Sequence, residues 1–165
     1  VLLNSLTDLI KGARTEELPE RIAELLNKIK EIEKELAAVR SAQALSQVGE
    51  LAKKAKVING ISFISSVMAD GVSGDDLRKI ALDLRSGQEK SVVALISSND
   101  GKPVLVVATS EEARSTGVKA GALVKIGSTI LGGGGGGKDD FAQGGGIDAS
   151  KSEDALTAIS NALVG

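Results

Sequence analysis

Residues 132–146 read GGGGGGKDDFAQGGG, and no other stretch of the 165-residue sequence is as distinctive. Six consecutive glycines provide a backbone without Cβ atoms, which can adopt positive φ angles or approach another surface closely. Each ordered glycine costs roughly 0.5–1 kcal/mol relative to alanine in backbone entropy. Flexible linkers are usually mixtures of glycine and serine, whereas here Phe141, Ala142 and Gln143 separate two glycine clusters. We therefore interpret the stretch as a functional loop rather than a linker.

The residues on either side of this loop predict a mixed α/β module. Asn59-Gly60 and Asn99-Asp100-Gly101 are turn sequences between apolar segments that are typical of strands. Continuous apolar runs favour buried strands, and the glycines of the last segment would weaken it as a strand. The expected strands are 57–58, 61–67, 92–96, 104–108 and, as a short edge strand, 142–146.

Three helices are expected in the same module. Ser73, with Asp76 three residues later, resembles a capping box at a helix start. Residues 120–131 form an apolar helical segment that leads directly into the glycines. A last helix near the end of the sequence would direct three apolar side chains inward, at Leu156, Ile159 and Leu163.

A second, helical module precedes the α/β module. Its apolar residues alternate in steps of four and three, which is the a/d pattern of a coiled coil. Because Pro19 is tolerated only in a first turn, the helix should begin at 16–18 and run towards Val48, a length on the order of 45 Å. The residues of this seam are Leu18, Ile22, Leu25, Ile29, Ile32, Leu36 and Val39.

Two interpretations of the seam stay open. It can serve as an oligomerisation or spacer arm, or it can pack against its own chain. A shorter amphipathic segment that ends near Gly12 would supply the second helix of such a hairpin. The predicted fold is therefore α+β or α/β: a long helical hairpin or coiled coil in residues 1–52, followed by a small mixed α/β globular domain in residues 53–165.

The composition excludes several classes of function. The sequence has no cysteine and no histidine, which removes disulfides, Cys/His zinc sites, thiol catalysis and imidazole acid–base catalysis. The formal charge of −2 argues against a strongly electrostatic nucleic-acid binder. No apolar run of 18 residues predicts a membrane span, and no signal-peptide pattern is present. Because the sequence begins at Val1 within a helical pattern, we expect it to belong to a longer chain.

Other sites suggested by the sequence have weaker support. The glycines and Lys138 match the spacing of a phosphate-binding P-loop, but Asp139 stands where Ser or Thr is required and a helix precedes the loop. Asp139 and Asp140 would form a metal pair only with further ligands, so a solvated turn is favoured. Lysines 53, 54 and 56 can contact a nucleic-acid backbone or, as we favour, complement the dipole of a helix end.

Two segments resemble one protein family. Residues 120–146, AGALVKIGSTILGGGGGGKDDFAQGGG, resemble the last conserved block of bacterial alanyl-tRNA synthetases, with Lys125, Ala142 and Gln143 in the family's positions. Residues 17–40, ELPERIAELLNKIKEIEKELAAVR, are similar to the coiled coil that follows the editing domain there. One departure is Asp139, where proline is usual. Related domains end some DHH-family phosphoesterases, but a histidine typically stands there in place of Lys138.

The resemblance implies a C-terminal appendage made of a helical subdomain and a globular DHH-associated subdomain. In the family this appendage helps the parent enzyme to bind tRNA at the outer corner of the L, and bridges the aminoacylation and editing modules. The implied partners are alanine-accepting tRNA, the other synthetase domains and a second copy held through the helices; no membrane is implied. The parent would be a cytoplasmic alanine–tRNA ligase. Its ATP site and editing zinc belong to parts absent from this sequence, so this segment needs no cofactor and has no catalytic or metal-binding residues.

We expect a non-catalytic tRNA-binding module that reads the shape of the RNA rather than its sequence. The glycine backbone would approach the RNA closely, Lys138 would contact phosphate or sugar, and Gln143 would hydrogen-bond within the loop or to the RNA. Valine at Gly134 and Gly135 should therefore weaken binding. A structural dimerisation or spacer module without RNA affinity is the alternative, and a phosphoesterase is disfavoured because the sequence has no metal-ligand cluster. The expected RNA-binding residues are Gly132, Gly133, Gly134, Gly135, Gly136, Gly137, Lys138, Gln143, Gly144, Gly145 and Gly146.

Overall fold

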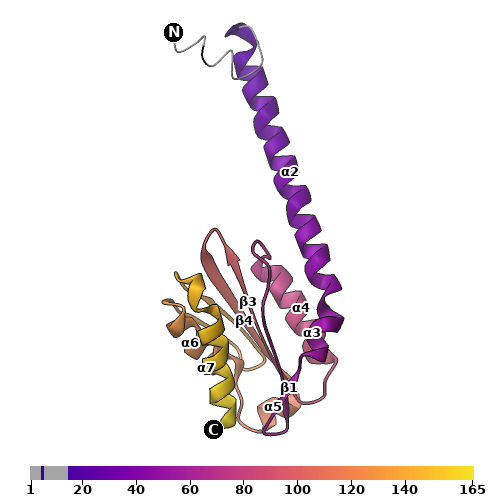
Figure 1. Ribbon diagram of the computed structural model, residues 1–165, viewed down its shortest axis with the longest axis vertical. Coiled ribbons are helices and arrows are strands. Elements are labelled where there is room, and N and C mark those ends of the chain that lie inside the picture. The colour runs from indigo at the N-terminus through magenta and orange to yellow at the C-terminus, as the bar shows by residue number, and fades with distance from the viewer. Residues whose placement is uncertain (1–4, 6–14) are drawn as a thin grey trace. The chain divides into compact units, whose positions relative to one another are not determined.

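The computed structural model of the chain describes Ser5 and residues 15–165 (Figure 1). Contacts divide the chain into two compact units, Val1–Val39 and Arg40–Gly165. The short helix predicted upstream, which would end near Gly12, lies outside the described residues. In the part of the chain that the structure describes, none of the helices combines the length and apolar character needed to cross a bilayer.

The long helix predicted from the heptad pattern is confirmed. A single 3₁₀ turn, η1 (Thr15–Glu17), leads into helix α2 (Leu18–Ser46), so that Pro19 lies in the first turn of the helix. A break at Gln47 separates α2 from the short helix α3 (Val48–Lys53). The last turns of α2 belong to the second compact unit, where Ala44 is buried together with Leu51 of α3.

A six-stranded mixed sheet forms the centre of the second unit. The strand order is β1-β2-β3-β4-β6-β5, and only the β2–β3 pair is parallel among these strands. Asn59 and Gly60, with φ angles of 50° and 78°, form the tight turn predicted between the first two strands. The strands are β1 (Lys56–Ile58), β2 (Ile61–Val67), β3 (Ser91–Asn99), β4 (Lys102–Thr109), β5 (Gly135–Gly137) and β6 (Phe141–Gly145).

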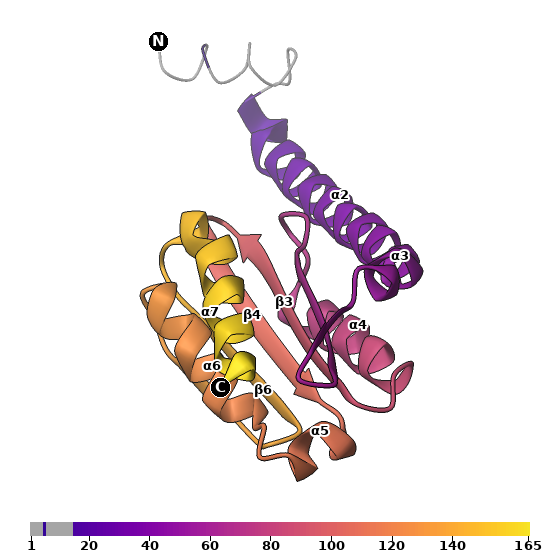
Figure 2. The ribbon, with the colours of Figure 1, turned by 60° about the horizontal axis from the view of Figure 1, so that its bottom comes forward.

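Helices cover both faces of this sheet (Figure 2). Helices α6 (Ala120–Ile130) and α7 (Ser152–Val164) bury one core against it, and Leu156, Ile159 and Leu163 are inside, as predicted. Helices α3 and α4 (Gly74–Ser86) bury a second core on the opposite face. The remaining helical segments are α5 (Glu111–Ser115), which was not predicted, and η2 (Ala149–Lys151).

The start of α4 confirms the predicted helix start, with Ser73 as its N-cap residue. The Oγ atom of Ser73 accepts a hydrogen bond from the backbone N–H of Asp76 at 3.2 Å and donates one to its carboxylate at 3.0 Å. The capped helix connects the parallel strands β2 and β3, which require a crossover of this kind. The predicted fold class, a long helix followed by a mixed α/β domain, is therefore confirmed.

One prediction about the sheet was wrong. The segment 142–146 was expected to be an edge strand, but β6 lies between β4 and β5. The edge is instead β5, which is formed by three residues of the glycine run itself. A segment of six identical residues without side chains has no apolar alternation, so the sequence pattern that normally reveals a strand was absent.

Candidate nucleic-acid interface

Gly132 ends helix α6. Its φ angle of +77° lies in the left-handed region, which side chains disfavour and glycine adopts readily at helix ends. Its N–H donates to the carbonyl of Thr129 at 3.1 Å, and the N–H of Gly133 donates to the carbonyl of Ser128 at 2.8 Å. The first residue of the glycine run therefore has a structural role that requires no ligand.

The next glycines form a hairpin with β6, and the pairing register determines which face each of them presents. Gly135 pairs with Gly144, and Gly137 with Ala142. Cross-strand partners project to the same face of a sheet, and Ala142 is 1% exposed within the core beneath α6. A Cβ atom added at Gly135 or at Gly144 would contact the side chain of Val124 in α6. These glycines thus let α6 lie directly on the backbone of the hairpin.

The opposite face of the hairpin is open at two glycines. Gly136 pairs with Gln143, so it faces away from α6, towards the side of the sheet that carries α4. A Cβ atom added at Gly134 or Gly136 would have no other atom within 4 Å. Helix α6 packs on both β5 and β6, whereas α4 packs on β3 and β4. We call this side of the hairpin the glycine ledge; it comprises the open positions Gly134 and Gly136 and the neighbouring side chains of Phe141 and Gln143.

The remaining glycines of the loop are held by close contacts with the protein's own backbone. A Cβ atom on Gly133 would meet the carbonyl of Gly145, and one on Gly145 would lie 2.7 Å from the carbonyl oxygen of Pro103. A Cβ atom on Gly146 would meet the carbonyl of Leu131. Most glycines of the predicted binding loop are therefore required by packing within the chain, in contrast to Gly134 and Gly136.

The ladder hydrogen bonds also orient the backbone of the edge strand. The N–H of Gly145 donates to the carbonyl of Gly134 at 3.1 Å, and the N–H of Lys138 donates to that of Phe141 at 2.9 Å. In an antiparallel ladder, alternate residues pair with the neighbouring strand. Gly135 and Gly137 therefore direct their N–H groups to the outer edge of the sheet, where a ligand can accept hydrogen bonds.

The turn of the hairpin carries the charged residues Lys138, Asp139 and Asp140. The carboxylate of Asp139 lies 3.4 Å from the Nζ atom of Lys119, and both side chains are exposed. The carbonyl of Asp139 accepts from Thr109 Oγ1 at 2.6 Å, and that of Asp140 accepts from the N–H of Thr109 at 2.9 Å. In the described ranges, no group of three or more acidic residues is arranged to hold a metal ion. The two aspartates hold the turn against β4, as a structural turn would.

Helix α4 adds residues that the sequence analysis missed. The guanidinium carbon of Arg78 lies 4.9 Å from the centroid of the Phe141 ring. Gln143 lies beside Gly74, where an added Cβ atom would be 2.8 Å from the side-chain Nε2. The Nη1 atom of Arg85 donates to the carbonyl of Asp140 at 3.3 Å. Positions 74, 78 and 85 are four and seven residues apart, so they share one side of the helix, and that spacing was the signal available in the sequence.

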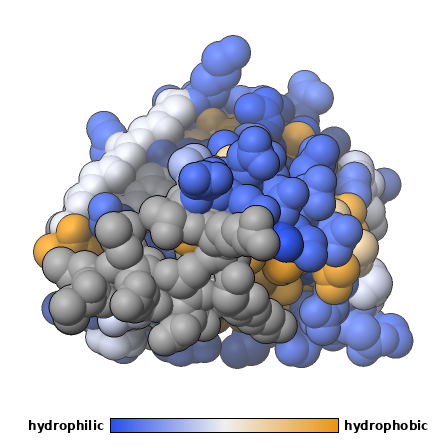
Figure 3. Space-filling view, turned by 90° about the horizontal axis from the view of Figure 1, so that it is seen from above, coloured by the Kyte–Doolittle hydropathy of each residue, from blue (hydrophilic) through white to orange (hydrophobic). Residues whose placement is uncertain are grey.

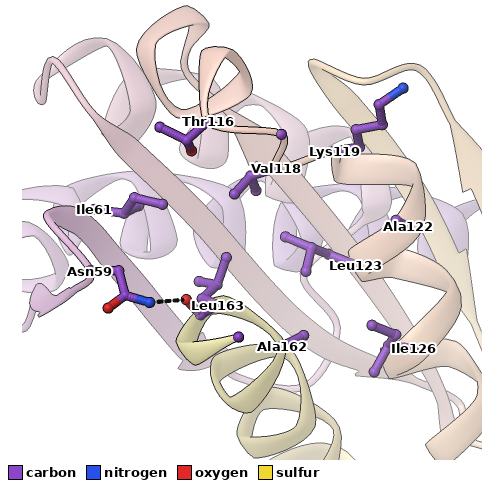
Figure 4. Close-up of a pocket in the computed structure, with 12 residues that line it drawn as sticks. Asn59, Ile61, Thr116, Val118, Lys119, Ala122, Leu123, Ile126, Ala162 and Leu163 are labelled. Atoms are coloured by element: carbon purple, nitrogen blue, oxygen red, sulfur yellow. Dashed lines mark hydrogen bonds between the residues drawn. The ribbon is translucent and has the colours of Figure 1, made fainter.

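The other candidate residues and cavities lie apart from the ledge. Lys53 ends α3 and pairs with Glu50 at 2.8 Å, in agreement with the helix-end interpretation. A pocket of about 410 Å³ opens between the β1–β2 turn, the start of α6 and the end of α7 (Figure 4). The amide of Asn59 at its rim donates to the carbonyls of Leu163 and Val164, both at 2.9 Å. This polar group therefore caps a helix rather than facing a ligand.

One face of the molecule, seen from above, combines hydrophilic and hydrophobic side chains. Figure 3 shows hydrophilic side chains over much of the visible face, with separate hydrophobic patches between them. With a formal net charge of −2, a nucleic-acid site on this chain would depend on close backbone contact and a few well-placed cations, because a strongly electrostatic binder is expected to be basic.

Comparison with known proteins defines the class of this fold and loop. The DHHA1 domain family matches residues 60–165. Alanine–tRNA ligases of Kineococcus radiotolerans and Streptomyces avermitilis are 49% and 43% identical to the chain over 162 and 155 residues. These matches cover 96% and 92% of the chain but only 18% and 17% of the relatives, so the chain spans less than a fifth of their length.

A solved structure narrows the assignment. The C-Ala domain of Aquifex aeolicus alanyl-tRNA synthetase is 32% identical, with a TM-score of 0.62, and the match covers 67% of this chain and 96% of that domain. The chain therefore belongs to the DHHA1 domain family and, within it, to the C-Ala domains of alanyl-tRNA synthetases.

Proposed function

We propose that this chain is a tRNA-binding module that acts within an alanine–tRNA ligase and presents the glycine ledge to the RNA. The supporting observation is the split among the glycines: Gly134 and Gly136 face open space on the side that α6 does not cover. Glycine at an open position is not explained by internal packing. A ligand that approaches the backbone closely explains the absence of side chains at both positions.

The chemistry of the ledge suits structured RNA. Sugar–phosphate backbones present hydroxyl groups and phosphate oxygens, and these can accept hydrogen bonds from the outward N–H groups of Gly135 and Gly137. Lys138, at the hairpin turn, is exposed and can add a positive charge. With a net charge of −2, the chain should recognise shape through few phosphate contacts. The rest of the proposal follows the resemblance to alanyl-tRNA synthetases: alanine-accepting tRNA as the substrate, a cytoplasmic location, other synthetase domains as neighbours, and ATP and zinc sites outside this sequence.

Valine at Gly136 should lower tRNA affinity about tenfold or more, with the fold intact. The side chain would occupy open space in the protein but would separate the ledge from a closely approaching RNA backbone. Fluorescence anisotropy with labelled alanine-accepting tRNA, an unrelated tRNA and single-stranded DNA, at two salt concentrations, measures the effect. Because shape is recognised, both tRNAs should bind, with a shallow salt dependence.

The exposed helical position Gly49 supplies a matched control for this substitution. A Cβ atom at Gly49 also has no atom within 4 Å, so Gly49→Val adds the same side chain away from the ledge. Gly134→Val, on the same face as Gly136, should reproduce the loss. Equal affinities for Gly136→Val, Gly49→Val and the wild type would refute a role of the ledge in binding.

A second candidate function, a dimerisation or spacer module, is favoured by the seam of α2. Its apolar side chains face solvent: Ile29 is 50% exposed, Ile32 60% and Val39 62%. This candidate predicts that the wild type is a dimer and that Ile29→Lys is a monomer, because a lysine in an a/d seam is costly. Sedimentation equilibrium measures the mass, and Asn27→Lys, off the seam, is the control. An unchanged mass in Ile29→Lys would exclude association through this seam.

A further inference from the structure

The side of α4 that faces β6 carries an arginine whose position suits ligand binding. Arg78 is exposed, and its guanidinium lies over the ring of Phe141, a residue of the glycine ledge. Stacking on an aromatic face fixes the plane of a guanidinium and leaves the N–H groups along its edge available. The site therefore presents a planar, oriented cation beside the backbone positions that have no side chains.

Arg78 differs from the neighbouring arginines in how its donors are used. The Nη1 atom of Arg85 donates to the carbonyl of Asp140, and that of Arg114 donates to the carbonyl of Thr109. Within the residues that the structure describes, Arg78 takes part in no hydrogen bond or ion pair. The carboxylate of Asp139, in the hairpin turn, lies 3.4 Å from the Nζ atom of Lys119. The ring of Phe141 holds the guanidinium in place, while its N–H donors have no hydrogen-bond partner among the described residues.

The aromatic residues of the chain favour a phosphate over a base as the ligand. The sequence has two phenylalanines and no tyrosine or tryptophan, and Phe63 is only 3% exposed. The guanidinium of Arg78 already occupies a face of Phe141, so base stacking there would have to displace it. A planar guanidinium instead matches two oxygens of a phosphate group.

We propose that Arg78, held on Phe141, is the phosphate-binding residue of the glycine ledge, and that one strand of an RNA backbone lies along the ledge between α4 and the edge strand β5. This inference rests on the proposed function and deepens it. It places the main phosphate contact on α4 rather than on Lys138 at the hairpin turn, the residue expected from the sequence. Phe141 acts as a positioning residue, because it orients the guanidinium without touching the phosphate.

The test compares Arg78→Gln with Lys79→Gln. Both remove one positive charge from α4, and both side chains are exposed. Position 79 lies about 100° further round the helix than position 78 and points away from the sheet. Anisotropy titrations with the alanine-accepting tRNA, over a series of salt concentrations, give both the affinity and the slope of log K against log[salt].

Arg78→Gln should weaken binding about tenfold, as expected for the loss of a charge-assisted contact. It should also make the salt slope shallower by about 0.7–0.9, since one phosphate contact is lost. Lys79→Gln should match the wild type. Arg78→Lys should keep the slope but lose affinity, because lysine keeps the charge and lacks the planar fork. Phe141→Leu should also lower affinity without changing the slope.

Distinct outcomes separate this inference from the proposed function. If Arg78→Gln and Lys79→Gln share the affinity and slope of the wild type while Gly136→Val loses binding, the phosphate contact lies elsewhere and only this inference fails. If the wild type binds neither tRNA at tens of micromolar, the proposed function and this inference both fail. If Arg78→Gln lowers the thermal midpoint, the tRNA affinities of Arg78→Lys and Lys79→Gln are compared instead. A lower affinity of Arg78→Lys supports the inference, and equal affinities refute it.

Discussion

Valine at Gly135 should strongly destabilise the β5–β6 edge of the sheet, although valine at the adjacent Gly136 should be accepted. A Cβ atom at Gly135 would meet Gly144 Cα and would lie 2.6 Å from Val124 Cγ1 and 2.8 Å from the Gln143 carbonyl oxygen. Two of these three atoms belong to backbone, so no change of rotamer relieves the clash. Overpacking usually costs 1–3 kcal/mol, and we expect about 3 kcal/mol here because the backbone must move.

Thermal unfolding followed by circular dichroism measures this difference. For a chain of this size, about 3 kcal/mol corresponds to a decrease of roughly 6–12 °C in Tm. Gly136→Val is the ideal control, because the two variants have identical composition and differ only in the face that receives the side chain. Equal Tm values for the two variants would show that the β5–β6 register does not hold in solution. The sequence predicts the same loss of binding for valine at Gly134 and at Gly135, whereas in the structure Gly134 is open and Gly135 is packed.

Valine at Gly127 should have the other large effect on stability. Gly127 is buried where α6 crosses the sheet, and an added Cβ atom would lie 2.5 Å from Leu105 Cδ2 and 2.9 Å from Ile159 Cδ1. The larger side chain would push α6 away from both β4 and α7. We expect a loss of about 3 kcal/mol or more in the free energy of unfolding, since overpacking here affects three elements at once. Urea denaturation measures the loss as a lower midpoint with an unchanged slope.

A double-mutant cycle tests the cause of this loss. Ile159→Val removes the Cδ1 atom that crowds position 127, and alone it should cost about 0.5–1.5 kcal/mol. If crowding is the cause, Gly127→Val combined with Ile159→Val should cost less than the sum of the two single changes. Strict additivity would instead assign the loss to the contact with Leu105, because helix propensity favours valine over glycine.

The sequence predicted most elements of the fold because their signals are local. Turn residues such as Asn59-Gly60, the Ser73 cap and the apolar runs each lie within a few positions of the element that they define. The helical seam was predicted equally well from its spacing, and its residues lie in α2. Which surface packs on the seam depends on a partner, and no local sequence pattern identifies that partner.

The candidate site was only partly predictable, for a physical reason. The glycine run and Gln143 were identified as the centre of the site, but all glycines look alike in a sequence. Their separation into packed and open positions depends on the pairing of β5 with β6. The contact between Arg78 and Phe141 joins residues far apart in the chain, so it exists only through the tertiary fold. The net charge of the chain also gives no indication of Arg78, because it sums this arginine with many acidic residues elsewhere in the chain.

The β5–β6 pairing has a consequence for the length of the glycine run. Alternating side chains normally determine which face of a strand is buried, but β5 consists of glycines and has no side chains. Its alignment is fixed at one end by the left-handed residue Gly132 and at the other by the Lys138–Phe141 hydrogen bond. Adding or removing a single glycine between these anchors would exchange the faces of the strand. The number of glycines in the run, as well as their presence, therefore determines which of them face α6 and which face the open side.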